Sequence, residues 1–218
     1  MLRKLQQLLE DIYDLPAAQD VGDFLLTDRA SLPAELRDSS SDEQLLVCDS
    51  HGEAAIGLFL DAALLQRLDA SNPLVSLHGG NVADFWTVLE GVSHFLYLAW
   101  HVDHDRAVSL LELERQAEID KYVTSLWLLR EQHPGRFPRG LHRLLFHQAR
   151  VDPRLVGERL WLYDRANRQA ARFCKRVERR LESAGAAARA TVVAELRRFY
   201  RWSSAHKHRH IEQLATPG

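Results

Sequence analysis

Cysteine is scarce in this 218-residue chain, which holds only Cys48 and Cys174. The two lie far apart and follow no metal-ligand spacing, which argues against a disulfide framework and against a cysteine-based zinc site. No apolar signal-peptide core follows the first residues, because glutamines and acidic residues interrupt them. Together these absences predict a cytoplasmic protein in a reducing compartment.

Long hydrophobic runs are also lacking. The most apolar stretch covers residues 85–102, at the short end of the ~17–25 residues that span a bilayer, and Glu90 interrupts it. We therefore predict a buried core helix and no membrane partner. Apolar residues make up 46% of the chain and charged residues 27%, which is typical of a folded globular protein.

Recognisable enzyme motifs are absent as well. The sequence contains no glycine-rich phosphate loop, no Gly-x-Ser-x-Gly elbow and no His-Glu-x-x-His pair. Candidate functional residues must therefore come from charge and from helical spacing.

Charge is divided unevenly along the chain, although the net formal charge is only −2. Residues 1–133 carry 9 basic and 23 acidic residues, a net charge of −14, whereas residues 134–218 carry 19 and 7, a net charge of +12. Such a division predicts either that the two halves dock on each other or that the basic half meets an anionic partner such as nucleic acid.

Hydrophobic periodicity predicts an α+β fold that is predominantly α. Helical spacing covers residues 1–13, short apolar runs typical of strands follow, and the chain is helical after about residue 80. We expect a small N-terminal antiparallel sheet, in a subdomain of residues 1–75, continuous with a bundle of about five helices in residues 76–218. The expected strands cover residues 24–26, 45–48 and 55–60, and the expected bundle helices 82–102, 107–132, 139–149, 154–183 and 188–213.

Two of these helices carry the most informative polar residues. Glu90 and His94 are four residues apart, as are Glu114 and Glu118, so each pair shares one helical face. If the short turn near residue 104 makes the helices antiparallel, His94 faces Glu114 and Glu90 faces Glu118. The carboxylates and the imidazole then meet inside the core, where they need compensation.

Three interpretations of this cluster stay open. Arginines of the basic half can neutralise it as a structural ion-pair network. A divalent metal can bind it, since ferritin-like bundles hold iron or manganese with such ligands, although their repeated Glu-x-x-His pattern is missing here. The cluster can also line a small-molecule or catalytic pocket.

The basic half carries two further candidate sites. A row of arginines on one face of the helix 154–183 has the spacing to contact phosphates. Near the C-terminus, Arg201 and His206 form an Arg-x4-His pair, and in this detail the segment resembles HEPN-type ribonucleases. The resemblance implies that these two residues assist phosphodiester cleavage. The row of arginines on the helix 154–183 consists of Arg165, Arg168, Arg172, Arg176 and Arg179.

The sequence thus supports three functional hypotheses. The first is a non-enzymatic interaction or regulatory protein that uses its acidic and basic halves for self-docking, for binding a protein partner or for forming a homo-oligomer. The second is a metal-dependent enzyme or binding protein built on the Glu/His cluster. The third is an RNA- or DNA-binding protein or nuclease that uses the arginine row and the Arg201/His206 pair.

Overall fold

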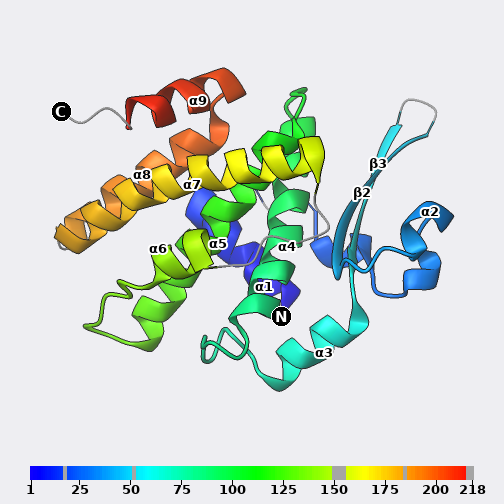
Figure 1. The fold of residues 1–218 in the computed structure, drawn as a ribbon, viewed down its shortest axis with the longest axis horizontal. Helices are drawn as coiled ribbons and strands as arrows, with labels where there is room; N and C mark the ends of the chain where they lie inside the picture. The colour runs from blue at the N-terminus through cyan, green and yellow to red at the C-terminus, as the bar shows by residue number, and fades with distance from the viewer. Residues whose placement is uncertain (17–18, 51–52, 149–155, 184–185, 215–218) are drawn as a thin grey trace.

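The computed structural model describes residues 1–16, 19–50, 53–148, 156–183 and 186–214. It confirms an α+β fold that is predominantly α. Figure 1 shows a central pair of long helices, with further helices on one side and a small sheet on the other. Within the described residues, no helix combines the length and the apolar character that a bilayer span requires.

The central pair consists of α4 (Val82–Val102) and α5 (Leu110–Gln132). The bounds of α4 match the prediction, and α5 begins three residues later than predicted. Its start is set by a capping box, in which Ser109 and Glu112 satisfy each other's backbone N–H groups. Trp86 Nε1 donates to Ser125 Oγ (2.9 Å), and because early α4 thus meets late α5, the two helices are antiparallel.

The sheet contains β1 (Leu25–Leu26), β2 (Glu43–Ser50) and β3 (Glu53–Leu60), in the order β1-β3-β2. β2 and β3 form the predicted antiparallel hairpin. β1 instead pairs parallel with β3, so the sheet is mixed rather than antiparallel throughout. The chain leaves β1 through α2 (Ala34–Arg37) before β2 begins, and this long connection lets β1 lie along β3 in the parallel sense.

The N-terminal helix α1 (Leu2–Tyr13) packs among helices of the second part of the chain. Its Leu5 and Leu9 belong to the same buried cluster as Phe95, Tyr122 and Phe173. The hydrophobic core is therefore continuous across the predicted boundary at residue 75. α3 (Ala62–Ala70) follows the sheet and connects it to α4.

The helices after α5 differ from the prediction in two places. The predicted helix 139–149 is a short α6 (Leu141–Arg143) followed by a π-helical turn (Leu144–Gln148). The predicted helix 188–213 is two helices, α8 (Ala186–Arg201) and α9 (Ser204–Gln213), and the bundle therefore has more helices than the expected five. α7 (Gly157–Ser183) ends where predicted, and residues 149–155, which include the predicted start at 154, lie outside the described part.

The break between α8 and α9 has a packing reason. α8 buries the apolar residues Val192, Leu196 and Phe199, whereas α9 buries Lys207 and Ile211. The chain turns at Ser203, whose backbone is extended (ψ 156°), so that α9 meets the bundle from a new direction. A continuous helical pattern in the sequence does not reveal such a turn.

Candidate functional site

The predicted Glu/His cluster lies where α4, α5 and the start of β2 meet. His94 Nε2 lies 3.8 Å from Glu114 Oε2, and His94 Nδ1 lies 3.5 Å from Glu43 Oε1. Lys121 Nζ donates to Glu90 Oε2 (2.9 Å) and to Glu118 Oε1 (2.5 Å). The structure therefore brings His94 and Glu114 together as the spacing predicted, while Glu90 and Glu118 meet through a lysine.

Two members of this cluster were missed by sequence reasoning. Glu43 stands at the edge of a polar loop, and no periodicity links it to α4. Lys121 had a signal, because it is one of only four lysines in the chain and lies three residues after Glu118. The ion-pair interpretation predicted that arginines of the basic half supply the positive counter-charges of the cluster. In the structure, Lys121 of the acidic half supplies the counter-charge to Glu90 and Glu118.

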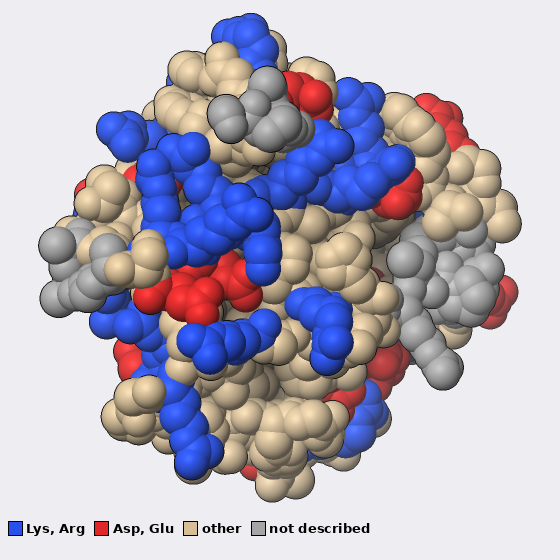
Figure 2. Space-filling view, turned by 60° about the vertical axis from the view of Figure 1, so that its left-hand side comes forward, with Lys and Arg blue, Asp and Glu red and all other residues tan. Residues whose placement is uncertain are grey.

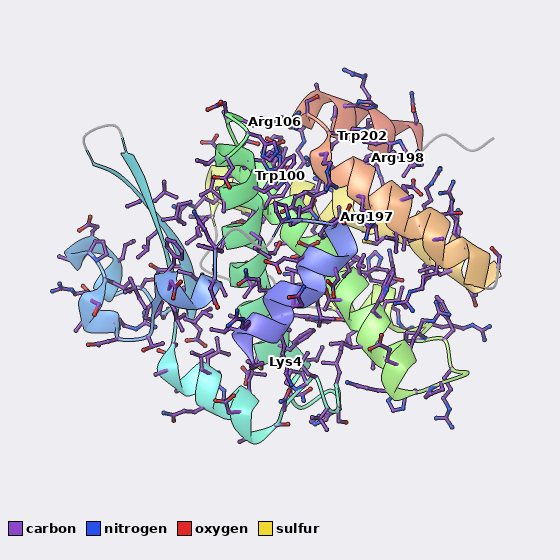
Figure 3. All side chains as sticks on the ribbon, turned by 180° about the vertical axis from the view of Figure 1, so that it is seen from behind. Lys4, Trp100, Arg106, Arg197, Arg198 and Trp202 are labelled. Carbon is purple, nitrogen blue, oxygen red and sulfur yellow. The ribbon has the colours of Figure 1, made fainter. Side chains whose placement is uncertain are left out.

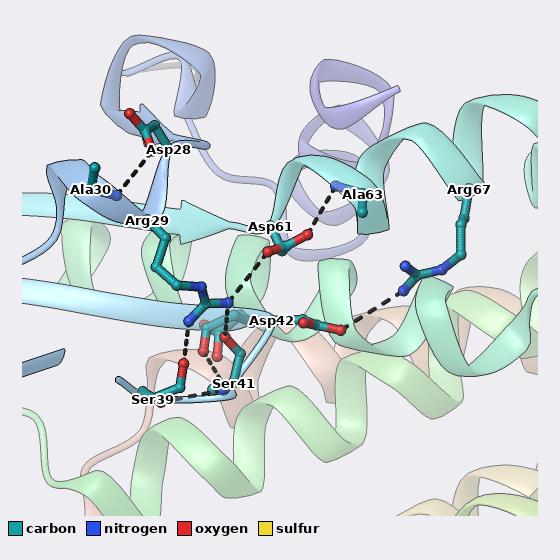
Figure 4. Close-up of polar contacts among 10 residues, drawn as sticks. Asp28, Arg29, Ala30, Ser39, Ser41, Asp42, Asp61, Ala63 and Arg67 are labelled. Atoms are coloured by element: carbon teal, nitrogen blue, oxygen red, sulfur yellow. Dashed lines mark hydrogen bonds and ion pairs between the residues drawn. The ribbon is translucent and has the colours of Figure 1, made fainter. Parts of the chain in front are cut away.

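The position of Glu43 is fixed by the polar contacts around Asp42 and Asp61 in Figure 4. The backbone N–H of Asp61 donates to the carbonyl oxygen of Asp42 (2.9 Å), and Arg29 donates to the carbonyl oxygen of Ser41 (3.0 Å) and to Asp61 (3.3 Å). Arg67 lies 3.8 Å from the Asp42 carboxylate. These contacts hold the start of β2 against the beginning of α3.

Gly91 makes the close approach of Glu43 to α4 possible. A Cβ atom at Gly91 would lie 2.9 Å from Glu43 Cγ and 2.8 Å from Leu58 Cδ1, closer than real Cβ contacts allow. A glycine inside a helix normally costs about 0.5–1 kcal/mol relative to alanine. At position 91 the missing side chain leaves room for the Glu43 side chain beside His94, and this packing offsets the cost.

We expect Gly91→Ala to destabilise the fold by about 1–2 kcal/mol, because overpacking costs about 1–3 kcal/mol and better helix propensity returns up to about 1 kcal/mol. Urea unfolding measures the change. Gly79→Ala is the matched control, since a Cβ atom there meets nothing within 4 Å. Equal stability of the two variants would contradict a tight contact at Gly91.

Burial and unbalanced charge perturb the pKa values of the site. Burial lowers the pKa of His94 by itself, but Glu114, Glu43 and Glu90 outweigh burial and raise the pKa to about 9. Burial raises the pKa of Glu114 to about 7, against the opposing charge of His94. Burial also raises the pKa values of Glu43 and Glu118. The folded site therefore favours a charged imidazole and resists the full ionisation of its acids.

Only Glu90 has a lowered pKa among these acids. Burial would raise it, but the charges of Lys121 and His94 lower it. With every group ionised, the site contains four carboxylates against one ammonium and one imidazolium, a net charge of −2. Two polar atoms of the site, Glu43 Oε1 and His94 Nε2, are also buried without a hydrogen-bond partner.

Four arginines of the α7 row lie beside acidic or aromatic side chains. Arg172 lies 3.3 Å from Glu212, and Arg176 lies 3.1 Å from Glu195. Arg168 pairs with Asp164 on its own helix, and Arg165 lies over the Trp161 ring; Arg179 is exposed. In Figure 2, which brings the side with α7 and α8 forward, basic side chains surround a patch of acidic ones.

The Arg201/His206 pair spans the break between α8 and α9. Arg201 donates from Nη1 to the carbonyl oxygen of Tyr13 (2.8 Å) and from Nη2 to that of Asp14 (2.7 Å), at the C-terminal end of α1. His206 instead stacks on Trp202, with ring centroids 4.2 Å apart. The structure thus gives Arg201 a docking contact with α1 and gives His206 a surface position.

Arg197 makes a similar contact with α1. It donates to the carbonyl oxygens of Ile12 (3.0 Å) and Asp11 (2.9 Å), and it lies 3.7 Å from the Asp14 carboxylate. Figure 3 shows Arg197 beside the end of α1, seen from behind. The C-terminal end of α1 is the negative end of its helix dipole, and it therefore stabilises the positive charge of Arg197.

No protein-family model, no curated protein and no solved structure matches this chain.

Proposed function

We propose that this protein binds one divalent transition-metal ion, Mn²⁺ or Fe²⁺, through Glu43, Glu90 and His94. The observation that carries the proposal is that each of these three side chains offers a ligand atom, and the three atoms lie within 4.8 Å of one another. Metal–ligand bonds of about 2.0–2.2 Å put neighbouring ligand atoms of an octahedral or tetrahedral site about 3.0–3.6 Å apart. The three ligand atoms therefore need to approach one another by up to about 1–2 Å to bind one ion.

Charge supports an ion at this place. With His94 neutral, as metal binding requires, the ionised cluster carries four carboxylates against one ammonium, a net charge of −3, and a divalent cation reduces this to −1. Binding also supplies a close contact for Glu43 Oε1, which is buried without a hydrogen-bond partner. Glu43 and Glu90 keep 13% and 25% of their side chains exposed, which gives the ion a route from solvent.

Glu114 has a different role, because an imidazole that binds a metal through one nitrogen commonly donates the other N–H to a carboxylate. Glu43 lies on the Nδ1 side of His94 and Glu114 on the Nε2 side. Glu114 therefore orients the imidazole ring. Two carboxylates and one imidazole form a donor set that suits Mn²⁺ or Fe²⁺ better than softer ions.

Titration of the purified protein with Mn²⁺ tests the proposal, with the free ion followed by its EPR signal. We expect one ion per chain, and Glu43→Gln is expected to weaken the affinity at least ~10-fold. Because His94 must lose its proton to bind, the affinity is expected to rise as the pH increases from 7 toward 9. Glu35→Gln, which changes an exposed glutamate of α2, serves as the control.

Two results would contradict this proposal. The first is the absence of Mn²⁺ and Fe²⁺ binding at pH 8. The second is binding that Glu43→Gln and Glu35→Gln weaken equally, which indicates surface carboxylates instead of the buried cluster.

The interaction hypothesis is a second candidate, and one observation favours it. The contacts of Arg197 and Arg201 with the end of α1 join the basic C-terminal half to the acidic N-terminal half within one chain. Partial separation of these surfaces would expose them to a second copy. Size-exclusion chromatography with light scattering, over a range of salt concentrations, tests this: a strictly monomeric protein at low salt would argue against assembly through these surfaces.

A further inference from the structure

Two buried basic side chains lie in the core, and among the described residues neither has an ion-pair contact with a carboxylate. Arg115 of α5 and Lys207 of α9 are each only 1% exposed. Both approach the same aromatic ring, because Arg115 Cζ lies 6.0 Å and Lys207 Nζ lies 5.5 Å from the centre of the Phe199 ring. Burial and the charge of Arg115 lower the pKa of Lys207 to about 7. Two positive charges in the same part of a core repel each other and lose hydration, so their burial requires compensation.

The contacts of these cations with the described residues are neutral. Arg115 Nη1 donates to the amide oxygen of Gln169 (2.9 Å), and Nη2 is buried with no hydrogen-bond partner. Lys207 Nζ donates to the hydroxyl of Tyr97 and lies 5.5 Å from the centre of the Phe199 ring. Among the described residues, no carboxylate forms an ion pair with either cation.

Glu112 and Asp120 are the carboxylates whose charges act most strongly on Lys207, and both already accept hydrogen bonds from other residues. Glu112 Oε2 accepts hydrogen bonds from the N–H (3.2 Å) and the hydroxyl (2.9 Å) of Ser109 at the start of α5. Asp120 accepts from the hydroxyls of Tyr13 and Ser93. Both carboxylates therefore serve other contacts, and the unpartnered Nη2 of Arg115 marks a place for a further acceptor.

We propose that Arg115 and Lys207 form a binding site for a small phosphate-class oxyanion. The unpartnered guanidinium N–H groups and the Lys207 amine supply donors from two helices. A bound anion favours the protonated form of Lys207, and the two positive charges then match a phosphate dianion. Gln169 and Tyr97, which hold the two cations in the structure, orient the donors.

α9 covers this site and provides a way to open it. Only Lys207 and Ile211 of α9 are buried, so this short helix is held by fewer buried side chains than α8. Lys207 and the rings of Tyr97 and Phe199 fill the space between α9 and the bundle. The ion therefore enters as α9 moves outward. The proposal consequently predicts that the anion stabilises the position of α9 as well as the whole fold.

Thermal unfolding in phosphate tests the proposal, with sodium chloride and sodium acetate at the same ionic strength as references. At a phosphate concentration 100 times its Kd, the melting temperature is expected to rise by roughly 5–10 °C. Lys207→Met, which keeps the length of the side chain and removes the charge, is expected to abolish the rise. Arg179→Met, at an exposed arginine of α7, is expected to retain it.

Equilibrium dialysis with labelled inorganic phosphate gives a second readout that does not depend on stability. We expect one phosphate per chain, with at least ~10-fold weaker binding in Arg115→Met and unchanged Mn²⁺ binding in that variant. An equal rise in melting temperature in wild type and in Lys207→Met would overturn the proposal, because excluded salts stabilise all folded proteins. The absence of bound phosphate, or a rise with acetate as large as that with phosphate, would overturn it as well.

Discussion

Replacing Lys121 with methionine is expected to lower the free energy of unfolding by about 3–5 kcal/mol at pH 8. Lys121 is 7% exposed and pairs with both Glu90 and Glu118, whose side chains are only 25% and 20% exposed. Methionine fills the same volume but leaves two partly buried carboxylates with no counter-charge, and breaking a buried pair in this way typically costs about that much. Urea unfolding of both proteins gives the difference.

The same variant distinguishes the metal hypothesis from a purely structural ion-pair network. Without Lys121, the carboxylates become more basic, so their protonation should make the loss smaller at pH 5 than at pH 8. Removing the competitor for Glu90 should also strengthen Mn²⁺ binding, and added Mn²⁺ should return part of the lost stability. Lys4→Met, at an exposed position of α1, is the control. A Lys121→Met protein as stable as Lys4→Met at pH 8 would show that this lysine does not compensate the site.

His94→Gln is expected to cost about 3 kcal/mol at pH 6 and much less at pH 9.5. The pKa of His94 is about 9 in the folded protein, against about 6.5 in an unfolded chain. A raised pKa stabilises the fold fully below pH 6.5, and this stabilisation is lost as the pH rises through 9. Because glutamine cannot carry the charge, the variant lacks this stabilisation at every pH.

Unfolding free energies measured from pH 6 to pH 9.5 test this prediction. The wild-type protein without metal should lose stability across this range, and the curve of His94→Gln should be flatter. His133→Gln changes an exposed histidine at the end of α5 and should leave the slope unchanged. Parallel curves for wild type and His94→Gln would mean that the imidazole is not charged at neutral pH in the fold.

Part of the candidate site was predictable from local spacing. Residues four apart in a helix share a face, so the pairs Glu90/His94 and Glu114/Glu118 follow from the sequence. The short turn after α4 then makes an antiparallel hairpin the simplest arrangement, and His94 does lie beside Glu114. The arginine row is also visible in the sequence, but its pairing with Glu195 and Glu212 is not.

The sequence by itself determined the helical character, the strands of the β2–β3 hairpin and the bounds of α4, because these depend on periodicity and on turn residues within a few positions. Only the tertiary structure decided that β1 runs parallel to β3, that the last helix breaks at Ser203, that Glu43 reaches His94 beside Gly91, and that Lys121 joins Glu90 to Glu118. These contacts join segments far apart in the chain. Packing and charge balance select them only after the chain has folded, and no local pattern of residues encodes such a choice.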